Sequence, residues 1–455
     1  LPQTPLNLIL KGRKASVLGA GRSGISAAAA LKRAGAEVFI SESRPRSRID
    51  KRILSRMNAF KSEFGGHSGR VLDADMIVVS PGIHLDIPIL ERARAKNIPI
   101  LGELELGWRL GEFKQVAAVT GTNGKTTTAS LLGHMCRTGG LKTLVAGNIG
   151  KPLCGFIGRS RSYDRTVLEV SSYQLESSVF FRPDAACVLN LTADHLERHA
   201  TMASYAGSKE NIFMNQTGGD TAVLNIDDPW CRKMRTGRAK TLFISTKRSV
   251  REGVYFDRGL SKIKYRCMGK SGLLPLPAHL PGLHNIENAC AAAALALALK
   301  IPAAAISRSL KTFKGVPHRL EKVRTVRGVV YVNDSKATNV DSTEKALLAL
   351  PGPLWLILGG RDKGAPYRPL STLVRKKVKG IFLIGEAAKK IERDLRGTAP
   401  FIRSGTLAGA VKDSYRRAVR GDKVLLSPAC ASFDQFKDFE DRGDQFKARV
   451  RELRP

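Results

Sequence analysis

Short, continuously apolar runs alternate along this chain with longer stretches of helix-compatible pattern. Residues 76–79, 116–119 and 354–358 are three such runs, and each is followed by a polar, glycine-containing loop. Runs of this kind are typical of strands buried on both faces, while the helical stretches supply the crossovers of a parallel sheet. The pattern therefore predicts an α/β fold with mostly parallel sheets and helices on both faces.

The alternation falls into three blocks, and 455 residues are enough for about three domains. We expect a Rossmann-like domain over 1–112, a central domain of the P-loop ATPase type over 113–314, and a second Rossmann-like domain over 315–455. Residues 315–319 are predicted to link the last two. Further expected elements are strands at 15–18, 37–40, 166–170, 185–191, 329–332 and 424–426, and a buried Ala-rich helix at 289–299.

The loop 121–126, Gly-Thr-Asn-Gly-Lys-Thr, carries the clearest candidate chemistry. It lies between the apolar run 116–119 and helix-compatible residues 127–135, which is the order of a phosphate-binding loop. Backbone N–H groups and a helix N-terminus favour phosphate, and Lys125 would reach the terminal phosphates. Thr126 is placed to bind Mg²⁺ through its hydroxyl. The usual upstream glycine is replaced by valine, so a plain turn is the alternative.

The first block opens with a second glycine loop, 19–24, before an Ala-rich helix. Glu42 follows the next strand, about 20 residues beyond the glycines, which completes a dinucleotide-binding fingerprint. The same geometry holds any diphosphate against a helix N-terminus, so a nucleotide-dependent dehydrogenase and a nucleotide-substrate domain both stay open. Residues 80–83, after the run 76–79, offer another place where backbone amides meet phosphate.

Three residues of the second block are considered one by one. Glu169 ends a predicted strand and is either a Mg²⁺ ligand or a surface carboxylate. His195 follows the strand 185–191 and either binds a metal or substrate or makes structural hydrogen bonds. Taken by itself, Lys209 is predicted to be a solvated lysine on a helix.

The third block places a distinctive loop after each of three predicted strands. These loops are 333–339, 359–364 and 427–434. Ligands of open parallel sheets bind at the carboxyl ends of strands. We therefore expect part of a site there.

The charge balance is strongly basic, with 75 Lys and Arg against 40 Asp and Glu, a net charge of +35. A basic ATPase acting on nucleic acid is one interpretation. The basic residues are spread over runs such as 44–52, 375–379 and 416–420, and aromatics make up only 6% of the chain. We favour a solvated basic surface that attracts polyanionic small substrates, and we expect no nucleic-acid partner.

The seven cysteines are scattered and form no CxxC pair, which predicts reduced, cytosolic thiols and neither a disulfide framework nor a zinc cluster. No apolar run approaches the roughly 20 residues of a membrane span. We therefore expect no membrane-spanning segment.

The segments 121–127, 168–176, 190–195 and 333–339 resemble motifs of the Mur ligases, the ATP-dependent amide-forming enzymes of peptidoglycan synthesis. The resemblance covers essentially the whole chain. Within the family, the segment 427–436 is similar to the member that adds D-glutamate, and the Asp-Asn-Pro loop of the ligase that adds the next, diamino, residue is absent. A folylpolyglutamate-synthase-like ligase is the nearest rival, and the UDP-type glycine loop of the first block argues against it.

The resemblance implies an ATP-dependent ligation in the cytoplasm of a bacterium. The carboxylate of UDP-N-acetylmuramoyl-L-alanine would attack the γ-phosphorus of ATP, and the amine of D-glutamate would attack the resulting acyl phosphate. Two Mg²⁺ sites, a monomer, and closure of the third domain onto the second are further implications. Lys209 would be carbamylated by CO₂, which turns a cation into an anion able to bind Mg²⁺.

The resemblance also assigns site residues. Those for the UDP substrate are Gly21, Arg22, Ser23, Glu42, Ser43, Arg44, Ser80, Gly82, Asn148 and His195. Those for ATP are Gly121, Thr122, Asn123, Gly124, Lys125, Thr126, Thr127, Asn285, Asn288, Arg319 and Asp334. Those for D-glutamate are Thr338, Lys363, Ser432 and Phe439, and the metal ligands are Thr126, Glu169, His195 and carbamylated Lys209. The catalytic set is Lys125, His195, Lys209 and Lys336. A helix N-cap is the alternative role for Asn285.

Overall fold

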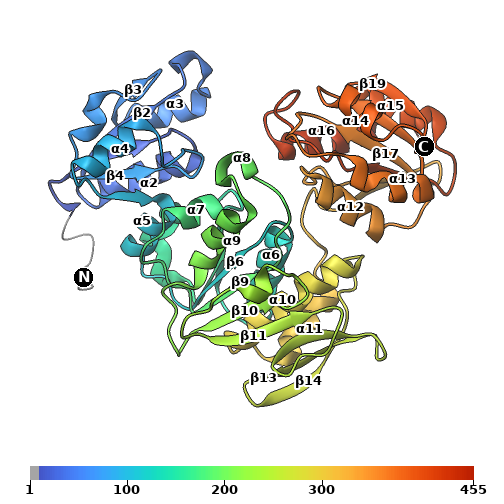
Figure 1. Cartoon of the computed structure of the whole chain (residues 1–455), viewed down its shortest axis with the longest axis horizontal. Coiled ribbons are helices and arrows are strands. Elements are labelled where there is room, and N and C mark those ends of the chain that lie inside the picture. The colour runs from blue at the N-terminus through green and yellow to red at the C-terminus, as the bar shows by residue number, and fades with distance from the viewer. Residues whose placement is uncertain (1–9, 455) are drawn as a thin grey trace. The chain divides into compact units, whose positions relative to one another are not determined.

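The computed structural model describes residues 10–454, which form two compact units (Figure 1). One unit contains the chain up to residue 276 together with 287–311, and the other contains 277–286 and 312–455. The first unit holds two of the three sheets, so the division into two units does not correspond to the three expected domains. The expected domain boundaries at 112 and 314 therefore stay predictions. The first expected domain also includes residues 1–9, which lie outside the described residues.

The first sheet is five-stranded and parallel, in the order β3-β2-β1-β4-β5. One face packs against α2 and α5, and the other against α4, because successive buried side chains of β1 and β4 point to opposite faces. The elements are β1 (Lys14–Leu18), α2 (Arg22–Arg33), β2 (Glu37–Glu42), η1 (Arg46–Arg48), α3 (Lys51–Met57), β3 (Lys61–Phe64), η2 (Gly69–Leu72), β4 (Met76–Val79), α4 (Pro88–Ala95), β5 (Ile100–Gly102) and α5 (Glu103–Leu110).

The second sheet has nine strands in the order β14-β13-β12-β11-β10-β9-β6-β8-β7, parallel from β7 to β12. Its strands are β6 (Val116–Thr120), β7 (Thr143–Gly147), β8 (Arg165–Glu169), β9 (Ala185–Val188), β10 (Thr221–Asn225), β11 (Lys240–Ser245), β12 (Gly253–Asp257), β13 (Lys262–Cys267) and β14 (Lys270–Leu274). Its helices are α6 (Lys125–Thr138), η3 (Leu153–Ser162), α7 (Ser172–Glu176), α8 (Leu196–His199), α9 (Met202–Glu210), η4 (Asn211–Phe213), η5 (Cys231–Lys233), α10 (Leu283–Ala298) and α11 (Ala303–Thr312).

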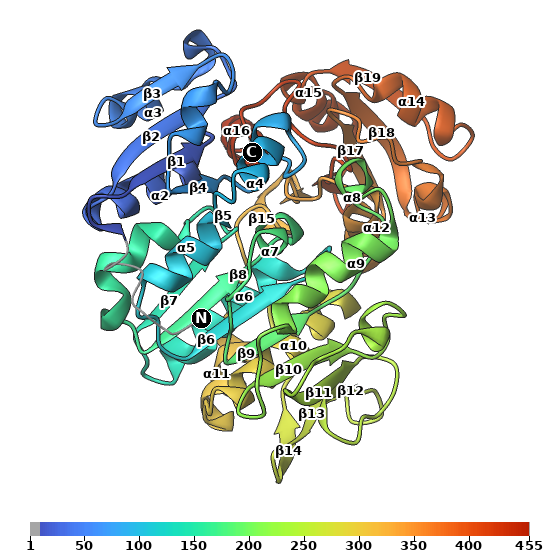
Figure 2. The same ribbon diagram turned by 60° about the vertical axis from the view of Figure 1, so that its left-hand side comes forward.

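Two antiparallel hairpins, β12–β13 and β13–β14, extend this sheet and were not predicted from the sequence. The second hairpin turns at Met268 and Gly269, with φ of 50° and 75°. Two residues with positive φ match the twist of a tight hairpin. Figure 2 shows α6 alongside β6 and β8, where the loop 121–126 leads from strand to helix.

The third sheet has six strands in the order β15-β16-β20-β17-β18-β19, and β15 is antiparallel to the rest. Helices α12, α13 and α14 cover one face, and α15 and α16 cover the other. The elements are β15 (Glu321–Val326), β16 (Val329–Asn333), α12 (Val340–Ala349), β17 (Leu354–Gly359), η6 (Arg368–Leu370), α13 (Ser371–Lys377), β18 (Val378–Ile384), α14 (Ala388–Asp394), β19 (Phe401–Gly405), α15 (Leu407–Arg417), β20 (Lys423–Leu426) and α16 (Phe439–Glu452).

These sheets confirm the predicted α/β class with mostly parallel strands. All seven cysteines are buried and free. Among residues 10–454, no helix is both long and apolar enough to cross a membrane.

Candidate active site

The loop 121–126 has the backbone of a phosphate loop. It joins β6 to α6, and Gly121 and Gly124 have φ of 144° and 88°. A Cβ atom on Gly124 would lie 2.2 Å from Asn288 Oδ1, so this turn requires glycine. The close approach also brings together two residues predicted to bind ATP.

Asn190, which follows the neighbouring strand β9, fixes this loop. The N–H groups of Thr122 and Asn123 donate to the main-chain and side-chain oxygens of Asn190, at 2.8 and 2.9 Å. Lys125 Nζ donates to the carbonyl oxygens of Gly121 and Thr122, both at 2.8 Å. The ammonium therefore lies over the loop, in the position that would meet a phosphate bound there. Thr127 is buried in the first turn of α6.

Two of the four predicted metal ligands are in direct contact. Thr126 Oγ1 donates to Glu169 Oε2 at 2.7 Å, and both residues are buried. The amide of Asn148 donates to the other oxygen of Glu169 at 2.8 Å. Strands β6 and β8 are adjacent and parallel, so the loop after β6, which leads to Thr126, lies beside Glu169 at the end of β8. The pair offers hard oxygen atoms, the donors that Mg²⁺ prefers.

No cluster of three or more His, Cys, Asp or Glu suited to a metal ion occurs among the described residues. Mg²⁺ bound with a nucleotide needs only one or two carboxylates, because phosphate oxygens and water complete its shell. The donor set at Thr126 and Glu169 therefore fits a nucleotide-linked Mg²⁺.

Lys209 is buried, so the expectation of a solvated lysine was wrong. Its Nζ donates to Gly121 O at 3.1 Å and to Thr120 Oγ1 at 3.3 Å. Burial, reinforced by the nearby charge of Lys125, lowers the pKa of Lys209 well below its ordinary value. Helix α9 thus brings a fully buried amine to the base of the phosphate loop, where burial disfavours its charged form.

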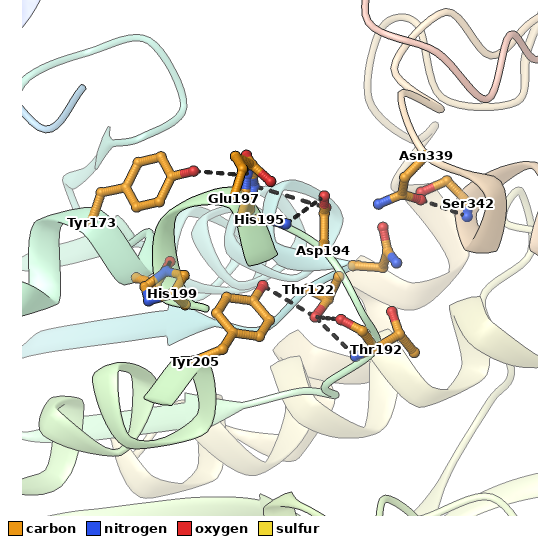
Figure 3. Close-up of polar contacts among 12 residues, drawn as sticks. Thr122, Tyr173, Thr192, Asp194, His195, Glu197, His199, Tyr205, Asn339 and Ser342 are labelled. Atoms are coloured by element: carbon orange, nitrogen blue, oxygen red, sulfur yellow. Dashed lines mark hydrogen bonds and ion pairs between the residues drawn. The ribbon is translucent and has the colours of Figure 1, made fainter. Parts of the chain in front are cut away.

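His195 lies in the loop after β9, with a φ of 57°, and its ring is held by a neighbour (Figure 3). Tyr173 Oη lies 2.8 Å from His195 Nδ1. Asp194 Oδ2 lies 3.8 Å from Nε2, and Glu197 Oε1 lies 3.5 Å from Nδ1. His195 is therefore part of a polar cluster, and its neighbours Tyr173 and Asp194 were not named as site residues from the sequence.

Tyr205 connects α9 to the phosphate loop. Its hydroxyl lies 3.2 Å from Thr122 Oγ1, which also donates to Thr192 O at 3.2 Å (Figure 3). Lys209 Nζ lies 4.7 Å from the centre of the Tyr205 ring. This role was not predictable from the sequence, since a tyrosine on a helix is usually part of the core.

The first domain assembles its predicted substrate residues around the glycine loop 19–24. Glu42 accepts from Ala20 N at 2.7 Å and pairs with Arg44 at 3.0 Å. Burial would raise the pKa of Glu42, but hydrogen bonds from Arg44 and Ala20 lower it to about 2. Ser43 Oγ lies 3.5 Å from Glu42 Oε1. The carboxylate thus fastens the loop itself.

The segment 80–83 lies against the same glycine loop. Ser80 Oγ donates to Gly19 O at 3.2 Å, and a Cβ atom on Gly24 would lie 1.8 Å from that oxygen. The N–H groups of Ser80 and Ile83 donate within the protein, so these two amides do not fit the expected phosphate-binding role. Gly21 and Ser23 flank the start of α2, and Gly82 is exposed.

Arg22 of the first domain lies close to the central domain. A Cβ atom on Gly150 would lie 3.2 Å from an Arg22 guanidinium nitrogen, and Asn148 belongs to the same turn. The structure thus brings together two residues predicted to bind the UDP substrate.

In the second unit, Asn285 and Arg319 line one cavity of about 530 Å³. Asn285 is the third residue of α10, and its amide donates back to Pro281 O at 2.7 Å. The N-cap alternative for Asn285 was therefore wrong. Arg319 Nε is buried without a protein hydrogen-bond partner in the described structure, and its predicted role in ATP binding stays a prediction.

Asp334 is a buried carboxyl group of the same unit, close enough to Arg319 for their charges to interact. It accepts from Leu320 N at 3.2 Å and from Ser427 Oγ at 2.8 Å. Burial raises the pKa of Asp334 to about 6, against the opposing charge of Arg319. The loops after β16 and β20 therefore meet at this carboxyl group.

The predicted D-glutamate residues surround the same strand ends. Lys336 Nζ lies 4.4 Å from the centre of the Phe439 ring, and Thr338 N donates to Lys336 O at 3.0 Å. Ser432 is buried in the loop after β20, whereas Lys363 is exposed in the loop after β17. Asn339 accepts from Ser342 N at 2.8 Å and caps α12 (Figure 3).

Arg442 of α16 connects two of these loops and was missed in the sequence. Its side chain is fully buried. It donates to Ser335 Oγ and O at 3.0 and 2.8 Å, to Cys430 O at 3.2 Å and to Ala431 O at 3.4 Å. A polar helix rich in charges gave no signal that one arginine points inward.

The phosphate loop on one parallel sheet, together with a nucleotide-type glycine loop on another, is typical of a nucleotide-binding α/β protein. Family models described as MurD-like N-terminal domain, Mur ligase middle domain, and Mur ligase glutamate ligase domain match residues 13–102, 119–296 and 318–430. The chain belongs to the Mur ligase family. It is therefore an ATP-dependent amide-forming ligase with a three-domain α/β architecture.

Similar proteins cover the chain almost completely. The chain is 43% identical to UDP-N-acetylmuramoylalanine–D-glutamate ligase of Koribacter versatilis, and the match covers 98% of both chains. It is 42% identical to the ligase of the same name from Acidobacterium capsulatum, over 97% of this chain and 96% of that one. A pseudomurein peptide ligase type C from Methanothermus fervidus has the same fold, with a TM-score of 0.61 at 20% identity over 97% of this chain and 100% of that one. UDP-N-acetylmuramate-alanine ligase of Thermotoga maritima also has this fold, with a TM-score of 0.59 at 20% identity. The match covers 96% of this chain and 99% of that one.

Proposed function

We propose that this chain joins D-glutamate to UDP-N-acetylmuramoyl-L-alanine at the expense of ATP, in the synthesis of a peptidoglycan precursor. The observation that carries the proposal is the 43% identity, over 98% of both chains, to a ligase named for this product. The segment 427–436, similar to the D-glutamate-adding member, supports the same substrate.

The chemistry follows from the reactivity of carboxylates. A carboxylate is a poor acyl donor, so its oxygen attacks the γ-phosphorus of ATP and ADP leaves. The amine of D-glutamate then attacks the carbonyl carbon of the acyl phosphate, loses a proton, and phosphate leaves. Lys125 at the phosphate loop and Lys336 at the third-domain loops supply cations for the transferred phosphoryl group.

Residues Thr126 and Glu169 would hold a Mg²⁺ ion that accompanies ATP, with Asn148 orienting the carboxylate. Such an ion neutralises phosphate charge during transfer. We propose a second Mg²⁺ near His195, whose ring Tyr173 fixes at 2.8 Å. His195 would bind through Nε2, since Nδ1 is engaged by the tyrosine hydroxyl.

Carbamylation of Lys209 is part of the proposal. A neutral amine attacks the carbon of CO₂, and loss of one proton leaves a carbamate anion. Burial of the Lys209 amine beside Lys125 supports its availability as a nucleophile. The carbamate would supply a ligand for the second Mg²⁺.

We assign the three substrates to the three expected domains, 1–112, 113–314 and 315–455. Arg22, Glu42 and Arg44 lie around the glycine loop that would hold the UDP diphosphate. ATP would bind the loop 121–126, with Asn285 and Arg319 on the nucleoside side. Thr338, Lys363, Ser432 and Phe439 would meet the D-glutamate carboxylates. A monomer in the cytoplasm, with closure of the third domain on the second, completes the proposal.

One assay tests the reaction. Phosphate release from ATP should require both UDP-N-acetylmuramoyl-L-alanine and D-glutamate, and mass spectrometry should find the amide product. Release that DNA or RNA stimulates, or release with a pteroylglutamate in place of the UDP substrate, would contradict the proposal. Hydride transfer to a nicotinamide cofactor would favour the dehydrogenase alternative.

A further inference from the structure

Two basic runs that the reaction does not use lie at the same edge of the third sheet. Residues 375–379 pass from the end of α13 into β18, and residues 416–420 pass from the end of α15 toward β20. Leu354 of β17 pairs with Val378 on one side and with Lys423 on the other. The two runs are therefore separated by a single strand, or about 10 Å.

An ion pair between the exposed Lys379 and the buried Asp422 links the runs. Lys379 Nζ lies 3.0 Å from Asp422 Oδ2, and Val419 N donates to the same oxygen at 3.0 Å. Asp422 is only 2% exposed, whereas the side chain of Lys379 is 42% exposed, so the cation of the pair lies at the surface. Arg375, Lys376, Lys379, Arg416, Arg417 and Arg420 are exposed around it, and we name this set the basic edge.

Exposed aliphatic side chains lie among these cations. Val419 is 58% exposed and Leu348 is 59% exposed. The carbonyl oxygen of Leu348 accepts from Lys377 Nζ at 3.3 Å, which places the end of α12 at the same edge. Cations surrounding exposed aliphatic groups match a surface that is anionic outside and apolar beneath.

We propose that the basic edge docks this protein on an anionic lipid bilayer. The edge lies at the amino ends of β16, β20, β17 and β18, whereas the loops of the candidate site follow their carboxyl ends. A bilayer bound at the edge therefore leaves those loops accessible to substrate. The inference does not depend on which amino acid the enzyme adds.

Nucleic acid fits this edge less well. Single strands are bound by stacking bases on exposed aromatic rings. Here the Trp355 ring is 9% exposed with Lys379 Nζ at 5.9 Å, and the half-buried Tyr415 ring has the Arg327 guanidinium at 5.1 Å. The exposed apolar groups at the edge are aliphatic, and these suit acyl chains.

Vesicle binding tests the proposal with the full-length protein. Each Lys or Arg near an anionic membrane contributes about fivefold to binding, so Arg375→Ser/Lys376→Ser/Arg417→Ser should lower the partition coefficient on phosphatidylcholine–phosphatidylglycerol vesicles by roughly 100-fold. The matched control, Arg258→Ser/Lys262→Ser/Arg266→Ser, removes the same charge from the exposed side of the β12–β13 hairpin and should bind like the wild type.

A second variant tests the apolar part. Leu348→Ser/Val419→Ser should retain binding at low salt but lose the fraction that resists high salt, because screening weakens only the charge contribution. The proposal would be overturned if the partition coefficient fell equally in both triple variants. It would also be overturned if the wild type bound vesicles of phosphatidylcholine alone as well as it binds the anionic vesicles. Binding to a DNA duplex that the edge variant loses, without vesicle binding, would overturn it in favour of nucleic-acid phosphates. Thermal unfolding and phosphate release verify that each variant is folded.

Discussion

Lys125 and Lys209, 84 residues apart, donate to the same main-chain oxygen. Their Nζ atoms lie 2.8 and 3.1 Å from Gly121 O. Burial, and after it the nearby charge of Lys125, lowers the pKa of Lys209. The structure thus places two lysines of different helices at one oxygen of the phosphate loop, and only Lys209 is fully buried there.

We expect Lys209→Ala to reduce ligation at least about 100-fold, because the variant cannot form the proposed carbamate ligand of the proposed second Mg²⁺. Added acetate or formate should restore part of the activity by replacing the carboxylate. Labelling with ¹³C-bicarbonate should give a carbamate signal by NMR that Lys209→Ala lacks. Lys233→Ala, an exposed lysine, serves as control. A fully active Lys209→Ala enzyme, or an unchanged NMR signal, would show that Lys209 is not modified.

Glu169→Gln should raise the Mg²⁺ concentration for half-maximal activity at least about tenfold, because an amide oxygen carries no charge to offset the ion. Asn148→Ala should raise it less, since Asn148 only orients the carboxylate. Binding of Mn²⁺ measured by electron paramagnetic resonance gives a readout independent of turnover. The exposed Glu91→Gln should behave as wild type. An unchanged Mn²⁺ affinity in Glu169→Gln would remove Glu169 from the metal site.

Gly124→Ala tests whether the loop needs its glycine for close approach. An alanine with positive φ costs about 1–2 kcal/mol of stability at either Gly124 or Gly140. At Gly140 a Cβ atom meets nothing within 4 Å, whereas at Gly124 it meets Asn288 Oδ1 at 2.2 Å. Gly140→Ala should therefore keep its KM for ATP, and Gly124→Ala should raise it roughly tenfold or more. Equal KM values in the two variants would refute the steric argument.

The sequence was sufficient to predict which residues meet at the strand ends. It was insufficient to predict which charged side chains are buried there. Thr126 and Glu169 each follow or end an apolar strand, so their meeting follows from parallel topology. Lys209 and Arg442 lie in polar helical stretches that are indistinguishable from solvated faces. Only tertiary packing decides that these two cations turn inward, because their partners are mostly main-chain oxygens, which leave no mark in the side-chain pattern.

Glu103 predicts a pH dependence of stability. Burial raises its pKa from 4.5 to about 7, and its Oε2 has no hydrogen-bond partner in the described structure. A folded state with the higher pKa binds the proton more tightly, so this stabilisation is complete below about pH 4.5 and is lost as the pH rises through about 7. The full loss amounts to about 3 kcal/mol at 1.36 kcal/mol per pKa unit.

Urea unfolding of the wild type and Glu103→Gln at about pH 6 and pH 8.5 measures this loss. The variant has no proton to release, so its unfolding midpoint should fall less between the two pH values. Other titrating groups contribute equally to both proteins and cancel in the comparison. The exposed Glu91→Gln should keep the wild-type slope. Parallel slopes in wild type and Glu103→Gln would show that Glu103 is charged in the folded protein.

Arg442 should act on the D-glutamate site through the loops it joins. Its guanidinium bonds the loop after β16 at Ser335 and the loop after β20 at Cys430. Arg442→Met removes the shared donor, and a displacement of about 1 Å in positioning groups costs up to 100-fold, so KM for D-glutamate should rise roughly 10- to 100-fold. Affinity for the UDP substrate, which we assign to the first domain, should stay unchanged.

Two further variants separate positioning from general loss of structure. Arg442→Lys keeps a buried cation with fewer donors, so it should recover part of the D-glutamate affinity. Arg449→Met, an exposed position of the same helix, should match the wild type. Global destabilisation would lower kcat and the amount of folded enzyme without moving KM for one substrate alone. A uniform fall in kcat with an unchanged KM for D-glutamate would therefore assign Arg442 to the fold and exclude it from positioning.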